Sequence, residues 1–262
     1  MIEVEKGVFI TSDLSCYNRF IKKIKTPEDW VSIKITDDFC MTDRKNIVFG
    51  CSIGKKIDGW QFRLMDYIGY NRLHQRNIIV LVSINDYNDA SKVYDGHTID
   101  DRELRSHEPE VLVHSTTWEN YRMIKEDECL KSWNMLKRTL PTFENEPIGL
   151  LLGDPDDISD YIMLGTGVSG EIVVLSKQKG EICMDCDVEY TPGARIYFDS
   201  RVLANQGLLE RDGLHYKVKD QLPLHLSIFI ATLENVTIDG KITPKTFAAA
   251  ADEAFEKMRT TL

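Results

Sequence analysis

The spacing of apolar residues predicts an N-terminal region in which short strands surround one helix. Four segments are rich in β-branched and aromatic residues and are bounded by turn residues: residues 7–12, 30–36, 46–53 and 77–84. Between the first two, residues 14–25 place Leu14, Tyr17 and Phe20 on one face at helical spacing. We therefore expect residues 1–90 to form a β-rich lobe of the α+β class, whose role the pattern does not indicate.

From residue 91 to residue 262, the pattern predicts a second region that is mostly antiparallel. A polar connection leads to a short strand over residues 110–114 and then to a helix over residues 116–129. Five further strands, separated by glycine and aspartate turns, are expected at residues 147–152, 171–176, 181–190, 195–199 and 214–218. Residues 243–262 predict a closing helix with Pro244 in its first turn. Its apolar stripe consists of Phe247, Ala251, Phe255 and Met258.

Composition indicates an ordinary globular protein. Hydrophobic residues make up 42% and charged residues 28% of the 262 residues, which excludes a disordered or fibrous chain. No apolar run approaches the roughly 18 residues of a membrane-spanning helix, and the first residues lack the basic and apolar segments of a secretory signal. We therefore expect a cytoplasmic protein without a membrane partner.

The net charge of −10 restricts the partners further. Proteins that cover extended phosphate backbones usually carry a basic balance or a basic face. The acidic total therefore argues against extensive nucleic-acid binding and against an anionic membrane surface. It remains compatible with a local basic cleft.

Two short motifs have simple structural interpretations. Cys183 and Cys186 have the spacing of half a zinc site, but a zinc ribbon needs a second such pair and the chain has none, so we expect reduced thiols and no metal. Gly165, Gly167 and Gly170 match the Gly-x-Gly-x-x-Gly pattern of dinucleotide-binding turns. Because a strand is predicted directly after them, a flexible hairpin is the interpretation that we favour.

Residues 92–116 contain two histidine motifs in series. The first reads Asp-Gly-His-Thr-Ile at residues 95–99, and the second reads Glu-Pro-Glu-Val-Leu-Val-His-Ser-Thr at residues 108–116. In sequence and spacing they resemble the Gln-Gly-His-Ser-Ile and Pro-Pro-x-Val-Leu-Tyr-His-Gly-Thr motifs of the RNA 2′-phosphotransferases, the NAD-dependent KptA family. Weaker similarity, as at residues 194–199, extends the resemblance over residues 92–233.

The resemblance implies an ADP-ribosyltransferase-like fold, a split mixed and antiparallel β core with packed helices that clamps NAD in a cleft. It also implies the two-step chemistry that this family performs in tRNA processing. An RNA 2′-phosphate attacks C1 of the nicotinamide ribose and expels nicotinamide. Transesterification then releases the RNA and a cyclic phosphate of ADP-ribose. Such a reaction requires a bent NAD and a well-placed anionic nucleophile, and it requires no metal ion.

The resemblance further implies roles for individual residues. His114 would contact NAD at a ribose hydroxyl or at the diphosphate, and Thr116 would add a hydroxyl nearby; imidazole and hydroxyl groups suit this task because both can donate and accept hydrogen bonds. The other cofactor-binding residues that it implies are Gly96, His97 and Thr98. The residues implied to act on the reacting groups are His97, Lys92 in place of a family arginine, and Arg138 as the phosphate-binding arginine. Each also has a plain structural interpretation, as a strand-end histidine, a turn residue or an exposed cation.

The chain also departs from the family pattern. Residues 1–91 contain no adjacent Arg-His pair, Ser115 replaces a glycine, and residues 147–152 contain no histidine. One hypothesis is an NAD-dependent transferase acting on an RNA 2′-phosphate, another phosphate or a protein side chain. The alternative is a degenerate transferase fold that serves as a binding module. A third hypothesis is a hydrolytic or nucleotide-binding enzyme of another class. The sequence gives it no support, because it contains no phosphate loop, no Gly-x-Ser-x-Gly elbow and no His-Glu-x-x-His motif.

Overall fold

Long-range contacts divide the chain into two units. The computed structural model describes residues 1–36, 42–43, 48–56, 58–94, 104–105, 107–140, 156–212 and 215–261. Unit 1 comprises Met1–Ile99 with Arg211–Leu214, and unit 2 comprises Asp100–Glu210 with His215–Leu262. The expected division lay between residues 90 and 91. Both units mix helices and strands, so the α+β class expected from the sequence is confirmed.

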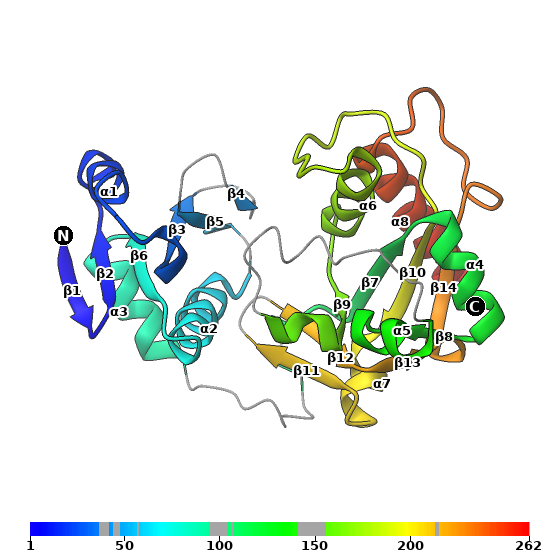
Figure 1. Ribbon diagram of the computed structural model, residues 1–262, viewed down its shortest axis with the longest axis horizontal. Helices are drawn as coiled ribbons and strands as arrows, with labels where there is room; N and C mark the ends of the chain where they lie inside the picture. Colours follow the sequence, from blue (N-terminus) through cyan, green and yellow to red (C-terminus); the bar gives the residue numbers. More distant parts are fainter. Residues whose placement is uncertain are drawn as a thin grey trace. The chain divides into compact units, whose positions relative to one another are not determined.

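Unit 1 is built on one six-stranded sheet with the order β1-β2-β6-β3-β5-β4, drawn in blue to cyan in Figure 1. Its strands are β1 (Ile2–Glu5), β2 (Val8–Thr11), β3 (Trp30–Thr36), β4 (Thr42–Asp43), β5 (Phe49–Gly54) and β6 (Asn77–Leu81). The four inner strands run parallel, whereas β1 and β4 join the edges antiparallel. Ile78, Ile79 and Val80 of β6 are each 0% exposed, as expected for a parallel strand buried on both faces.

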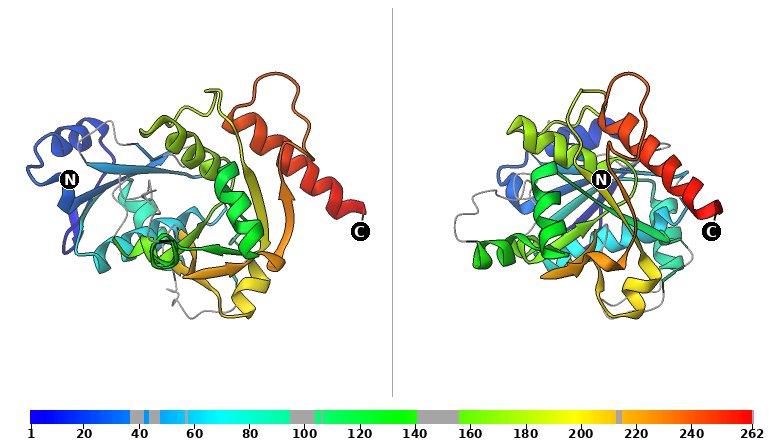
Figure 2. Two further views of the ribbon diagram at one scale, coloured as in Figure 1. Left: turned by 45° about the vertical axis from the view of Figure 1, so that its right-hand side comes forward. Right: turned by 90° about the vertical axis from the view of Figure 1, so that its right-hand side faces the viewer.

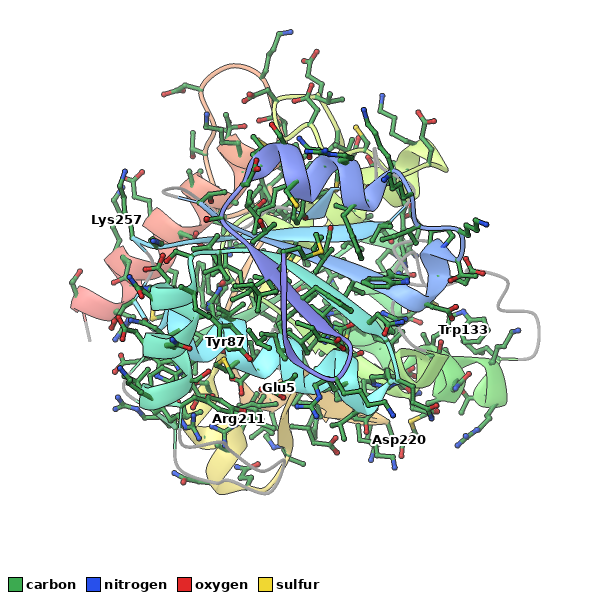
Figure 3. The ribbon with its side chains drawn as sticks, turned by 90° about the vertical axis from the view of Figure 1, so that its left-hand side faces the viewer. Glu5, Tyr87, Trp133, Arg211, Asp220 and Lys257 are labelled. Carbon is green, nitrogen blue, oxygen red and sulfur yellow. The ribbon has the colours of Figure 1, made fainter. Side chains whose placement is uncertain are left out.

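Helices cover both faces of this sheet. They are α1 (Leu14–Ile21), α2 (Trp60–Leu73) and α3 (Ile84–Val93), with a 3₁₀ turn η1 (Pro27–Asp29) before β3. Tyr17 of α1 packs with Ile79 on one face, and Leu64 of α2 packs with Val80 on the other; Figure 3 shows α1 and the α2–α3 pair on opposite sides of the strands. The lobe is therefore less β-rich than the sequence predicted.

The sequence pattern missed α2 for a physical reason. Two polar residues, Asp66 and Asn71, are buried in this helix at 8% and 1% exposure, so its apolar residues form no continuous stripe. The Asn71 side chain donates a hydrogen bond to the Tyr67 carbonyl oxygen, and the Tyr94 hydroxyl donates one to Asp66. These bonds satisfy polar groups that would otherwise oppose burial.

Three small, mainly antiparallel sheets lie among the described residues of unit 2, and the last two residues of one of their strands, β11, belong to unit 1. Their strands are β7 (Val111–Thr116), β8 (Cys129–Lys131), β9 (Tyr161–Leu164), β10 (Ala194–Asp199), β11 (Leu209–Asp212), β12 (His215–Lys219), β13 (Gln221–Pro223) and β14 (Ser227–Ala231). The sheet orders are β14-β10-β7, β11-β12-β9 and β13-β8. A bridge between Val113 and Gly165 joins the first two sheets beside β7. The core is thus split into sheets that meet at this strand.

Five helices lie among the described residues of unit 2. They are α4 (Trp118–Asp127), α5 (Trp133–Thr139), α6 (Ser169–Lys179), α7 (Ser200–Asn205) and α8 (Pro244–Thr261), with 3₁₀ turns η3 (Asp156–Asp160) and η4 (Leu224–Leu226). Helix α8 begins at Pro244 as predicted, and Phe247, Ala251 and Phe255 are buried at 3% exposure or less. Figure 2 shows α8 in red alongside β14 in orange. No described helix is long and apolar enough to cross a membrane.

Several predicted elements of unit 2 are corrected by the structure. Residues 171–176, expected as a strand, belong to helix α6, and residues 181–190 contain no strand. The strands predicted at residues 110–114, 195–199 and 214–218 correspond to β7, β10 and β12. The strand predicted at residues 147–152 lies outside the described residues. The predicted helix over residues 116–129 is α4, and the Thr117 hydroxyl caps it by accepting from the Asn120 amide.

Gly193 provides a test of the packing between β7 and β10. A Cβ atom at this position would lie 2.2 Å from the Thr117 carbonyl carbon and 2.3 Å from the Thr116 carbonyl oxygen. We expect Gly193→Ala to lower the free energy of unfolding by about 3 kcal/mol, because backbone must move to admit the methyl group. Urea denaturation measures this change. Gly69→Ala, in the open interior of α2, should instead stabilise by about 0.5–1 kcal/mol. Equal stability of Gly193→Ala and the wild type would contradict the close approach.

Candidate functional site

The two faces of the β7–β10 pair carry different chemistry. Alternate residues of a strand point to opposite faces, and directly paired residues share a face. One face holds Leu112, His114 and Thr116 of β7, paired with Phe198, Ile196 and Ala194 of β10. The other holds Val113 and Ser115, paired with Tyr197 and Arg195. His114 and Thr116, the two residues of β7 that the family resemblance implies to bind a cofactor, therefore lie on one face.

The His114 ring is fixed by the neighbouring strand β9. Its Nδ1 lies 3.0 Å from the Met163 backbone oxygen. A carbonyl oxygen can only accept, so Nδ1 carries the proton and donates, and Nε2 of the neutral ring presents a lone pair. Burial lowers the pKa of His114 below its ordinary 6.5, the bond to Met163 opposes this, and the Lys177 ammonium lowers the pKa further. His114 is thus a neutral hydrogen-bond acceptor at neutral pH.

Three consecutive residues of β7 bind the segment that runs from β9 into α6. The Val113 amide donates to the Gly165 carbonyl oxygen and the Gly165 amide donates back, each at 2.9 Å. His114 binds Met163, and the Ser115 hydroxyl donates to Glu171 Oε1 at 2.5 Å. The strand is therefore attached to this segment at Val113 and Ser115, the residues before and after His114. The orientation of the His114 ring consequently depends on the position of α6.

A buried polar network lies on the opposite face of β7. Glu171 and Arg195 are each 1% exposed. The Tyr190 hydroxyl donates to Glu171 Oε2 at 2.6 Å, Arg195 Nη1 lies 3.6 Å from Glu171 Oε1, and Arg195 Nη2 donates to Asp252 Oδ1 of α8 at 3.1 Å. Burial raises the pKa of Glu171, whereas the hydroxyls of Ser115 and Tyr190 and the charge of Arg195 oppose that rise. The network ties α6, β10 and α8 together behind the candidate site.

The glycine-rich segment between β9 and α6 has the context of a dinucleotide-binding turn. A strand precedes it and helix α6 follows, so the expected flexible hairpin is wrong. Gly167 has a φ of +61°, a backbone conformation that glycine adopts without strain. A Cβ atom at Gly170 would lie 2.6 Å from the Ser115 hydroxyl oxygen, so this glycine allows the first turn of α6 to approach β7. No side chain caps the amino end of α6.

The sequence contains a signal for helix α6, but neighbouring residues that favour a strand outweighed it. Residues 172–174 are Ile-Val-Val, which favour a strand. Lys177 and Lys179 in the last turn, followed by Gly180 in the left-handed conformation at φ +66°, are typical of a helix end. Because the strand propensity was given more weight, sequence reasoning missed Glu171, which binds Ser115, and Lys177, whose charge lowers the pKa of His114.

The other predicted site residues lie elsewhere in the chain or outside its described part. Lys92 lies in α3 of unit 1, where it is exposed and 3.5 Å from Asp89. Arg138 is exposed in the last turn of α5, a helix that packs against η3. Gly96, His97 and Thr98 lie outside the described residues. Within the described part of unit 2, His114 and Thr116 are the predicted site residues that share one strand face.

The cysteine pair lies in the connection between α6 and β10. Cys183 and Cys186 are both free and partly buried. The Cys183 amide donates to the Ser176 hydroxyl of α6 at 3.0 Å, so the connection is attached to the helix. Within the described part of the chain, no group of three or more His, Cys, Asp and Glu side chains is placed to hold a metal ion.

Comparison of the chain with protein-family models, curated proteins and solved structures gives no match. The functional argument for this protein therefore rests on its own residues and on the resemblance of the two histidine motifs.

The buried network makes a prediction about stability. We expect Glu171→Ala to lower the free energy of unfolding by about 3 kcal/mol, because it leaves the buried Arg195 with one carboxylate and removes the acceptor of Ser115. Ser115→Ala should cost about 1–2 kcal/mol. Chemical denaturation measures both. Glu253→Ala, which removes an exposed carboxylate of α8 paired with Lys257, should leave stability unchanged. A Glu171→Ala protein as stable as this control would contradict the role of the network.

The depressed pKa of His114 predicts a pH dependence of stability. The unfolded imidazole takes up a proton near pH 6.5, whereas the folded one does so only at lower pH. Stability from this residue is therefore present above pH 6.5 and is lost as pH falls through the folded-state pKa. Replacement by the non-titrating His114→Gln should flatten the decline in unfolding free energy between about pH 7 and pH 5. Parallel denaturation series on the two proteins measure it, and equal slopes would contradict a depressed pKa.

Proposed function

We propose that this protein is an NAD-dependent transferase whose unit 2 binds NAD against β7. The acceptor that we propose is an RNA 2′-phosphate, with another phosphate or a protein side chain as the variant of the same reaction. The observation that carries the proposal is the neutral His114 ring, fixed through Nδ1 to Met163 beside the glycine-rich turn at the start of α6. The resemblance of residues 108–116 to the transferase motif supports it independently.

The tautomer of His114 determines which kind of ligand atom can bind to its ring. Nε2 is an acceptor, so the ligand atom that meets it must donate a hydrogen bond. A ribose hydroxyl can donate, whereas a diphosphate ester at neutral pH carries no proton. We therefore assign the ribose, not the diphosphate, to His114. Thr116 shares the face of β7 with His114 and supplies a hydroxyl of the kind that sugar recognition uses.

The start of α6 suits the diphosphate. Gly165 is hydrogen-bonded through its backbone to Val113, the residue before His114, so the turn lies beside β7. The amide groups of an uncapped helix start attract anionic oxygens. Lys177 is close enough to influence the pKa of His114 and has no ion pair within the described residues. Partial desolvation lowers the pKa of Lys177, and its exposed side chain is accessible to an anionic ligand.

In this reaction the main task of the protein is to position the reacting groups. Bound NAD supplies a C1 carbon whose bond to nicotinamide breaks, the electron pair leaving with the ring nitrogen, while an acceptor oxygen forms the new bond. His114 and Thr116 orient the ribose by hydrogen bonds. The amides of the turn before α6 hold the diphosphate and fix the angle between the two halves of the ligand. Holding NAD in this way lowers the entropic part of the barrier.

The alternative, a degenerate fold that serves as a binding module, is favoured by one observation. Arg138, the cation of unit 2 expected to act on the acceptor, is exposed in the last turn of α5, which packs against η3. Under this alternative the protein binds NAD weakly or not at all and releases no nicotinamide with any acceptor.

The proposal is tested by chromatographic measurement of nicotinamide release from NAD. The acceptor is a short RNA with one internal 2′-phosphate, and reactions without RNA provide the baseline. We expect acceptor-dependent release in the wild type and a loss of about tenfold to hundredfold in His114→Ala, the equivalent of one buried hydrogen bond to a ligand. His225→Ala, which removes an exposed histidine of η4, should match the wild type.

The outcomes separate the two functions. The absence of nicotinamide release across 2′-phosphorylated RNA, other phosphorylated RNAs and protein acceptors would contradict the transferase. Weak or absent NAD binding by calorimetry, in a protein shown to be folded, would support the binding or interaction module.

A further inference from the structure

Charge is distributed unevenly between the two units. Residues 1–99 contain 14 Lys and Arg against 13 Asp and Glu, whereas the remaining residues contain 18 against 29. The total of −10 therefore comes from the C-terminal part of the chain, and unit 1 is close to neutral. The acidic total charge argues against polyanion binding by the whole protein. It does not argue against polyanion binding by unit 1, because unit 1 carries almost no net charge.

Cations are concentrated at the end of α1. Arg19, Lys22, Lys23 and Lys25 occupy four of seven consecutive positions, and all four are exposed. We call them the α1 basic patch. They form no ion pair within the described residues, and the nearest carboxylates in sequence are Glu28 and Asp29. The helix dipole accounts for cations in the last turn of α1, but Lys23 and Lys25 lie beyond the helix.

Three aromatic rings adjoin the α1 basic patch. Phe9 of β2, Phe20 of α1 and Trp30 of β3 form a mutual cluster, with ring centroids 5.8 Å apart for Phe9–Phe20, 5.6 Å for Phe9–Trp30 and 5.2 Å for Phe20–Trp30. Each residue remains partly exposed. Phe20 lies within the run of four cations, and Trp30 follows Lys25 by five residues, so the rings adjoin the cations along the chain. Figure 3 shows α1 lying across this side of the sheet.

We propose that the α1 basic patch and its three aromatic rings bind single-stranded nucleic acid. Cations that contact phosphates together with exposed rings on which bases stack are the two components of such surfaces. An acidic protein partner would use the cations and leave the rings without a role. This surface belongs to unit 1 and works without NAD, so the inference stands apart from the transferase proposed for unit 2.

Salt dependence of oligonucleotide binding tests the cations. The full chain is titrated, without NAD, into a fluorescent 12-nucleotide oligouridine between 50 and 300 mM salt, and anisotropy reports binding. We expect the triple variant Lys22→Gln, Lys23→Gln, Lys25→Gln to bind more weakly and to reduce the slope of log K against log salt by about 2, at about 0.7 per phosphate contact. The control is Lys241→Gln, Lys245→Gln, Lys257→Gln, which makes the same charge change in unit 2. Equal slopes for both triple variants would overturn the proposal.

Substitution of the rings tests stacking. Phe20→Leu keeps an apolar side chain and should weaken binding about tenfold without changing the salt slope, because stacking releases no counterions. Trp30→Leu should act in the same way, and circular dichroism of both variants checks the fold. Folded variants with wild-type affinity would overturn the role of the rings.

Two further probes distinguish a nucleic acid from an anionic membrane as the polyanion that binds. Binding of oligouridine, with or without equal binding of oligothymidine, supports a single-stranded nucleic-acid surface. Binding of phosphatidylserine vesicles through the same lysines, with no binding of either oligonucleotide, would overturn it in favour of a membrane surface. Because none of these assays contains NAD, failure here leaves the test of nicotinamide release intact.

Discussion

The attachment of β7 to the segment from β9 into α6 is the constraint on which the candidate site depends. Val113, His114 and Ser115 bind this segment in turn, through a backbone bridge, a ring nitrogen and a hydroxyl. Each bond is ordinary in strength, but the three are consecutive and leave the strand no freedom to rotate. The proton of His114 is consequently fixed on Nδ1 and its lone pair on Nε2. These three bonds thus determine both the orientation of the His114 ring and the kind of ligand group, a hydrogen-bond donor, that can bind to its Nε2.

The buried ionic network maintains this arrangement from the opposite face. Isolated buried charges are costly, and a pair is tolerated only when further hydrogen bonds complete it. Glu171 receives hydroxyls from Ser115 and Tyr190, while Arg195 is shared with Asp252 of α8. Helix α6 is therefore attached on two sides, to β7 by Ser115 and to β10 and α8 by Arg195. The glycine-rich turn at its start is positioned by the same contacts and by the backbone bridge between Gly165 and Val113.

Local sequence pattern predicted the elements in which one physical preference dominates. Helix α8 has a proline start and a continuous apolar stripe, and β6 has an uninterrupted apolar run, so both were correctly predicted. Helices α2 and α6 were missed because local preferences conflict, through buried Asp66 and Asn71 in one and β-branched residues in the other. His114 was found by its motif. Its hydrogen-bond partner was not, because His114 and Met163 are 49 residues apart and no local pattern reports such a contact.

The central claim is that His114 is a neutral acceptor whose Nε2 meets a ribose hydroxyl. The most direct measurement is the ¹⁵N spectrum of the histidine rings during a titration with NAD at pH 7, with His114→Ala used to assign the signals. The account predicts a protonated Nδ1 that is unchanged by NAD and an unprotonated Nε2 whose resonance shifts as the ligand binds. A proton on Nε2 in the free protein, or a His114 ring that does not respond while NAD binds elsewhere, would contradict it.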